Sequence, residues 1–160
     1  MKKTIIKVLL VIIAIVFVSV ILLISTSAAK AEDNLINKEK KALEHQNNGN
    51  KYDDNGKFKE AIVEYKESLK YAPDDPNTNF NLGHVYLKTN HPEEAVKAFE
   101  KVIEIDPKDE ESHNLLGIAL RGCKKRKEAI MIWEKSLKIN PNQPEVRQMI
   151  KETTETELEN

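Results

Sequence analysis

The chain contains a single cysteine, Cys123, so no disulfide can form within it. No cysteine lies near the end of the N-terminal apolar segment, which excludes a bacterial lipoprotein anchor. There is no Asn-x-Ser/Thr sequence, which fits a bacterial exported protein. The chain has only five glycines, and none of them belongs to a phosphate-binding loop. The pattern below places three of them inside helices and predicts that Gly56 and Gly122 form turns between helices.

The spacings of a catalytic or metal site are also missing. No two of the four histidines are spaced as metal ligands on one helix face. The acidic pairs at 53–54 and 74–75 flank predicted turns, where aspartates cap helices, and nothing predicts the burial that acid–base catalysis requires. We therefore predict a protein that is not an enzyme and binds no metal or cofactor. The histidines are His45, His84, His91 and His113.

An apolar segment opens the chain. Residues 8–24 carry no charge, and Ser19 is their only polar residue. Together with residues 5–7 they span ~30 Å as a helix, about the hydrocarbon thickness of a bilayer. Ala29 and Ala31 meet the small-x-small rule of signal peptidase. Residues 1–31 are therefore predicted to be a retained membrane anchor, with a signal peptide cleaved near Ala31 as the alternative.

The charge distribution predicts where the rest of the chain lies. Lysines near the N-terminus hold that end in the cytoplasm, so a single pass places everything after residue 31 outside, or in the periplasm or medium after cleavage. Four of the 25 basic residues precede residue 32, which leaves 21 against 26 acidic residues and a net charge of −5. Nucleic acid is therefore not an expected partner. The four are Lys2, Lys3, Lys7 and Lys30.

A 34-residue pattern occurs three times between residues 42 and 143. We call equivalent positions of the three units a slot. Asp75 and Pro76 mark the helix start of the middle unit, and Pro92 starts its second helix. Apolar residues recur at helical spacing in both helices. The slots with one shared character hold Gly49, Gly83 and Gly117; Ala61, Ala95 and Ala129; Tyr65, Phe99 and Trp133; and Pro73, Pro107 and Pro141.

This order of residues resembles the tetratricopeptide repeat family, whose unit is a helix–turn–helix of 34 residues. The resemblance covers units 42–75, 76–109 and 110–143, and it implies an all-α, right-handed solenoid in which neighbouring units bury each other's apolar faces. Glycine inside a helix costs ~1 kcal/mol relative to alanine, so the glycine slot indicates close approach of the paired helix. Residues 144–160 are predicted to cap the array, and residues 32–41 are either a charged linker or a helical extension.

The resemblance also implies a function. In such arrays the first helices of the units line a concave groove that holds a peptide or helix of a partner protein. Members that grip the C-terminal carboxylate of chaperone tails use basic residues where this chain has Gln46, Glu111 and Leu115, so that specificity is not expected. The predicted groove residues are Gln46, Asn50, Phe80, Asn81, His84, Asn114, Leu115, Ile118 and Arg121.

We therefore predict a non-catalytic scaffold or adaptor exposed outside the cytoplasmic membrane. The alternative is an envelope attachment protein that uses the basic residues of segment 121–127 on anionic lipid or wall polymer, at ~1 kcal/mol per charge. A solvated turn is the simpler interpretation of that segment. Its basic residues can also favour the thiolate of Cys123, although a small buried side chain at a helix end is the preferred interpretation.

Overall fold

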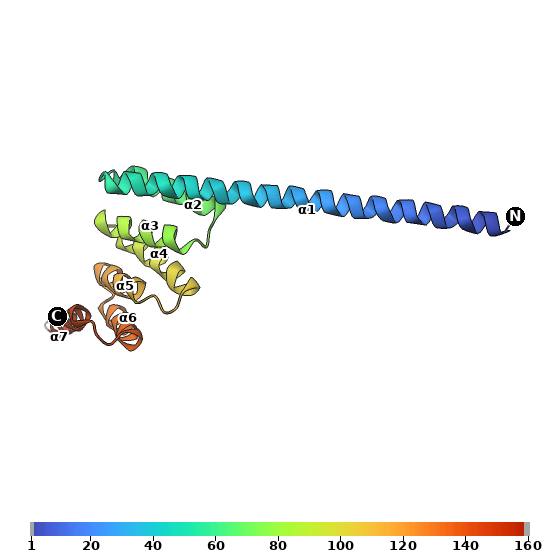
Figure 1. Cartoon of the computed structure of the whole chain (residues 1–160). Helices are drawn as coiled ribbons and strands as arrows, with labels where there is room; N and C mark the ends of the chain where they lie inside the picture. Colours follow the sequence, from blue (N-terminus) through green and yellow to red (C-terminus); the bar gives the residue numbers. More distant parts are fainter. Residues whose placement is uncertain (1, 159–160) are drawn as a thin grey trace. The chain divides into compact units, whose positions relative to one another are not determined.

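The computed structural model describes residues 2–158, with the side chains of residues 16–156. By its contacts the chain divides into two units, Met1–Lys40 and Lys41–Asn160. The described residues form seven α-helices (Figure 1): α1 (Lys2–Asp54), α2 (Phe58–Tyr71), α3 (Pro76–Lys88), α4 (Pro92–Ile105), α5 (Glu110–Gly122), α6 (Arg126–Ile139) and α7 (Pro144–Leu158).

The N-terminal unit is helical, because α1 runs without a break from Lys2 into the first repeat. Residues 32–41 belong to this helix. No helix within the described part of the chain is long and apolar enough to cross a membrane. The apolar run 8–24 lies partly outside the residues whose side chains are described. The membrane anchor therefore gains no support and stays a prediction.

The first helices of the second and third repeats start where the sequence predicts. The carboxylate of Asp75 accepts a hydrogen bond from the backbone N–H of Thr78 at 2.7 Å, which caps α3. Asp109 caps α5 in the same way, through the N–H groups of Glu111 and Ser112. Such a cap satisfies donors that the first turn of a helix leaves without partners.

The core of each repeat is an aromatic ring placed against a glycine. Trp133 has no solvent exposure, and a Cβ added at Gly117 would lie 2.2 Å from its Nε1. Alanine therefore does not fit between α5 and α6, which confirms the predicted close approach of the paired helices. The equivalent pairs are Gly49 with Tyr65 and Gly83 with Phe99.

A second periodic feature lies in the turn between the two helices of each repeat. Gly56, Asn90 and Lys124 have φ angles of 70°, 58° and 62°, so this slot requires the left-handed region in every unit. The prediction that Gly122 forms an inter-helix turn is wrong, since it is the last residue of α5. A Cβ there would meet the Cβ of Pro92 at 2.9 Å, so this glycine lets two repeats approach.

The last helix covers the end of the array, as the sequence predicts. Helix α7 packs on α6, and Val146 is buried between them. Met149 and Ile150 are half-buried and complete the same apolar face.

The glycine slot predicts the effect of adding one methyl group. Gly117→Ala should lower the free energy of unfolding by about 1–3 kcal/mol, because overpacking against the Trp133 ring outweighs the better helix propensity of alanine. Urea unfolding followed by circular dichroism measures this. Glu134→Ala, at an exposed position of α6, is the control and should leave the midpoint nearly unchanged. An unchanged midpoint for Gly117→Ala would contradict the packing argument.

The left-handed slot predicts a stabilising change. Lys124→Gly should raise the free energy of unfolding by roughly 0.5–1 kcal/mol, because glycine adopts a positive φ without the steric cost that lysine bears. Lys125→Gly is the matched control. The φ of Lys125 is −87°, an angle that any residue adopts, so glycine there should destabilise. Equal effects of the two changes in urea unfolding would show that the backbone angle does not matter.

Candidate functional site

The predicted groove residues lie on the first helices of the three repeats: the last part of α1, then α3 and α5. Helices α3 and α5 contact each other directly across the repeat boundary. The second helices of the three repeats are α2, α4 and α6. The candidate site is therefore the surface that these first helices share.

A pair of asparagines forms the polar centre of this surface. The Oδ1 atom of Asn50 accepts hydrogen bonds from the hydroxyl of Tyr65 at 2.8 Å and from the amide nitrogen of Asn81 at 3.0 Å. These bonds join the first two repeats and fix both half-buried amides. They leave the NH₂ group of Asn50 and the carbonyl oxygen of Asn81, a donor and an acceptor that match the two polar groups of a peptide unit.

The hydroxyl of Tyr65 is held in its protonated form. Burial raises its pKa from 10.0 to about 12, and the negative charges of Asp53 and Asp54 act in the same direction. Its proton is then available for Asn50 up to strongly alkaline pH. Asp53 is itself paired with Lys88, whose Nζ lies 2.8 Å from its Oδ1, so the first two repeats also share an ion pair.

Two further predicted residues use their amide nitrogens within the chain. Gln46 donates to Asp75 Oδ2 at 2.8 Å and to the hydroxyl of Thr78 at 2.9 Å, and Asn114 donates to Gln143 Oε1 at 2.6 Å. Two of these acceptors, Asp75 and Gln143, stand directly before the next helix of the array, α3 and α7 respectively. The sequence holds a signal for this, because the two donors share one slot and the two acceptors another.

Apolar side chains lie on the same helices. Phe80, Leu115 and Ile118 are half-buried and pack against the core, and Phe80 meets the Phe99 ring edge-on at 5.9 Å between centroids. Leu87 was missed by the sequence reasoning, although it lies seven residues after Phe80 and so on the same helix face. The structure thus gives the surface one more apolar member.

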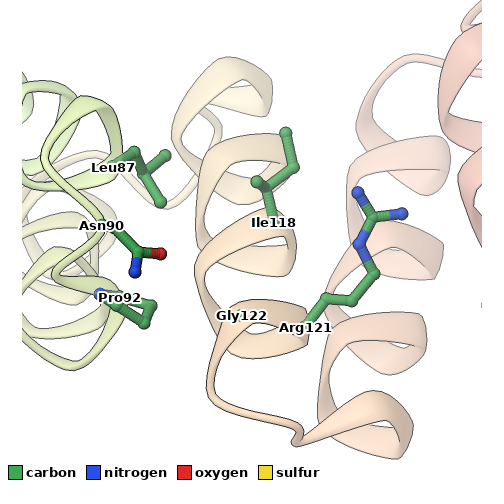
Figure 2. Close-up of a pocket in the computed structure, with 6 residues that line it drawn as sticks. All are labelled: Leu87, Asn90, Pro92, Ile118, Arg121 and Gly122. Atoms are coloured by element: carbon green, nitrogen blue, oxygen red, sulfur yellow. The ribbon is translucent and has the colours of Figure 1, made fainter.

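Leu87 helps to form a hollow between the second and third repeats. Figure 2 shows Leu87 and Ile118 facing each other across the hollow. The volume of the hollow is ≈ 310 Å³. Its remaining walls are Asn90, Pro92, Arg121 and Gly122. This hollow lies beside the left-handed turn of the second repeat and is large enough for an apolar side chain.

Arg121 does not point into that hollow. Its guanidinium lies 5.5 Å from the centre of the Trp133 ring, and in Figure 2 the side chain leaves α5 on the side away from Leu87 and Pro92. Only its stem belongs to the groove side. Within the basic segment, Lys125 also has a partner, the carboxylate of Glu128 at 3.3 Å.

The basic neighbours of Cys123 do not activate it. Partial burial raises the pKa of the thiol, and Glu93 adds to the effect, while Lys125 opposes it less strongly. The sequence context alone suggests a lowered pKa, but the pKa is raised, because burial and a carboxylate from the preceding repeat also act on this thiol. Cys123 lies directly after α5, at a helix end as predicted, and it is half-buried rather than buried.

Histidines and acidic residues do not assemble a metal site in the part of the chain that is described. His45 Nδ1 lies 2.7 Å from Glu64 Oε2, and its ring stacks on Tyr71 at 5.9 Å. His113 is buried, with Nδ1 2.8 Å from the backbone oxygen of Asp109. His45 therefore joins α1 to α2, whereas His113 bonds to the start of its own helix, α5.

Comparisons with known proteins agree with this architecture. Two family models, both described as tetratricopeptide repeat, match residues 54–118 and 110–143, which together make up more than half of the chain. No curated protein matches the chain significantly. The chain is a member of the tetratricopeptide repeat family.

Solved structures show the same fold at low sequence identity. The first repeat domain of Spaghetti (RPAP3), bound to the HSP90 peptide SRMEEVD, is 24% identical with a TM-score of 0.68, over 74% of this chain and 94% of that one. The second such domain of human RPAP3, with the HSP70 peptide SGPTIEEVD, is 22% identical with a TM-score of 0.68, over 73% and 98%. The Sgt2 domain from Aspergillus fumigatus is 22% identical with a TM-score of 0.65, over 74% and 80%.

The buried tyrosine predicts a pH dependence of stability. Its pKa is higher in the folded chain than in the unfolded one, so the folded state retains a proton that the unfolded state loses between pH 10 and about 12. Stability should therefore fall over this interval, by about 1.4 kcal/mol per pH unit from this group. Urea unfolding from pH 9 to 11.5 should show a smaller decline for Tyr65→Phe, and parallel declines would contradict the assignment.

Proposed function

We propose that this chain is a protein-interaction module that binds a peptide or helix of a partner protein along α3, α5 and the end of α1. One observation carries the proposal: an oriented pair of amides, Asn50 on α1 and Asn81 on α3, lies on first helices of the repeats. The half-buried Phe80 on α3 and Leu115 and Ile118 on α5 lie on first helices as well. A groove that binds peptides needs backbone partners and apolar contact together.

The two parts have separate roles in this mechanism. The NH₂ group of Asn50 donates to a peptide carbonyl, and the oxygen of Asn81 accepts from a peptide N–H. Because the hydroxyl of Tyr65 already holds the asparagine pair, little side-chain entropy is lost on binding. An apolar side chain of the partner enters the hollow between Leu87 and Ile118 and supplies the hydrophobic contribution.

The charge of the surface guides the choice of partner. Two solved relatives hold peptides that end in Glu-Glu-Val-Asp, as their descriptions state. Here Glu111 is exposed in the first turn of α5, where it repels an acidic C-terminus, and Gln46 is engaged with Asp75. We therefore propose a partner segment that is bound through its backbone and one apolar side chain.

The position of the module in the cell is part of the proposal. The apolar run 8–24, preceded by three lysines, supports a membrane anchor with the repeats on the outer side. In this arrangement the chain presents its groove to other exported proteins. The mass of the chain recovered from cells tests the anchor, because loss of residues 1–31 would show cleavage instead.

Selection from a displayed random peptide library, with the full chain in neutral detergent as the target, tests the groove. The combined change Phe80→Ala/Asn81→Ala/Ile118→Ala should weaken the best selected peptide at least tenfold in fluorescence anisotropy, since it removes the apolar contact and one backbone partner. Circular dichroism and the urea midpoint show whether the variant still folds.

The matched control lies on the second helices. Val63 and Met131 are 57% and 60% exposed, so Val63→Ala/Met131→Ala removes similar apolar area from the other face. This variant should bind the peptide as the parent does. A loss in the control and full binding in the groove variant would move the binding surface to the second helices.

A further inference from the structure

A second hollow lies at the C-terminal end of the array, on the side of α5 toward which the Arg121 side chain points. Its volume is ≈ 250 Å³, and its walls come from three helices: Arg121 of α5, Arg126 of α6, and Glu152, Thr153 and Thr156 of α7. The capping helix thus closes one side of a polar hollow that is lined by two arginines.

The charge of this hollow is not balanced within the described part of the chain. Arg121 rests on the face of Trp133, and neither Arg121 nor Arg126 forms an ion pair with any of residues 16–156. Glu152 also lines the hollow, and its carboxylate accepts a hydrogen bond from the side chain of Gln148 at 2.9 Å. Two positive charges and one negative charge leave a net charge of +1.

A buried hydroxyl gives an independent indication of a ligand. Thr153 is only 3% exposed, and its Oγ1 has no hydrogen-bond partner among the described residues. The neighbouring Thr154 instead donates to the carbonyl oxygen of Ile150, one turn earlier, at 2.8 Å. A buried polar group without a partner is costly, which is why nearly all such groups in folded proteins are satisfied.

We propose that this hollow binds the carboxylate of an acidic side chain from a partner polypeptide. The two planar guanidinium groups donate to its two oxygens, and a small movement lets the hydroxyl of Thr153 donate as well. The net charge of +1 matches a monoanion, whereas a dianionic phosphate would leave excess negative charge beside Glu152. The site shares Arg121 with the wall of the hollow beside Leu87, but it does not depend on the function proposed for the groove.

The chain carries its own reporter for this site. Trp133 is the only tryptophan, it is fully buried, and the guanidinium of Arg121 lies over its ring. A carboxylate that draws this cation from the ring changes the cation–π contact and therefore the tryptophan emission. Binding is also visible in the NMR signals of the arginine Nε–H groups.

The experiment titrates the full chain in neutral detergent with the peptide acetyl-Ala-Ala-Glu-Ala-Ala-amide at constant ionic strength. We expect a saturable change in emission and in the arginine signals. The same peptide with Gln in place of Glu should give none. Arg121→Gln and Arg126→Gln should each weaken binding at least tenfold, read from the arginine signal that remains, and Thr153→Val should weaken it about threefold. Phe80→Ala/Ile118→Ala, in the groove, should bind like the parent.

A gain-of-binding variant separates the proposal from simple unfolding. Glu152→Gln removes the opposing carboxylate and should tighten binding severalfold, a result that a damaged fold does not produce. Equal responses to the Glu and Gln peptides, or no saturable response in either readout, would overturn the site. Tighter binding of inorganic phosphate than of the Glu peptide would overturn the carboxylate assignment.

Discussion

The contact of an aromatic ring with a helical glycine determines how closely the two helices of each repeat approach, and the other features depend on it. In the first repeat the ring is Tyr65, whose hydroxyl reaches through to Asn50 and so orients the polar centre of the candidate groove. In the third repeat the ring is Trp133, whose Nε1–H donates a hydrogen bond to the backbone oxygen of Asn114. The guanidinium of Arg121 lies over the face of this ring. Core packing and candidate binding surfaces therefore share the same residues.

The first and third repeats resemble each other more than either resembles the second. Ser68 and Ser136 occupy one slot, and each donates across its repeat to a backbone oxygen of the paired helix, at 2.7 and 3.3 Å. The second repeat has Val102 there, which is buried and apolar. The slot of Gln46 and Asn114 likewise holds Phe80 in the second repeat. In these two slots the first and third repeats are thus held by hydrogen bonds and the second repeat by apolar packing. Phe80, in the second repeat, is the first apolar residue of the groove along the chain.

The sequence predicted those parts of the fold that local chemistry determines. Caps such as Asp75 and turns such as that before Pro92 depend on neighbouring residues, and the glycine slot repeats three times, so each could be recognised without coordinates. The polar contacts between repeats could not be predicted, because residues such as Gln46 and Asp75 lie 29 residues apart and meet only once the repeats stack. The direction of Arg121 was missed for the same reason, since helical spacing places the Cα atom but not the end of a long side chain. Peptide binding by the groove itself stays a prediction.

The half-buried Cys123 has a consequence for how the chain behaves among its own copies. Thiol–disulfide exchange proceeds through the thiolate, and the raised pKa of this thiol keeps that form scarce at neutral pH. The neighbouring lysines alone would lower this pKa and make the thiol more reactive. Because partial burial and the carboxylate of Glu93 in the neighbouring repeat together outweigh Lys125, the thiol of Cys123 is held in its less reactive protonated form. Packing of the two repeats thus disfavours a disulfide between two copies of the chain.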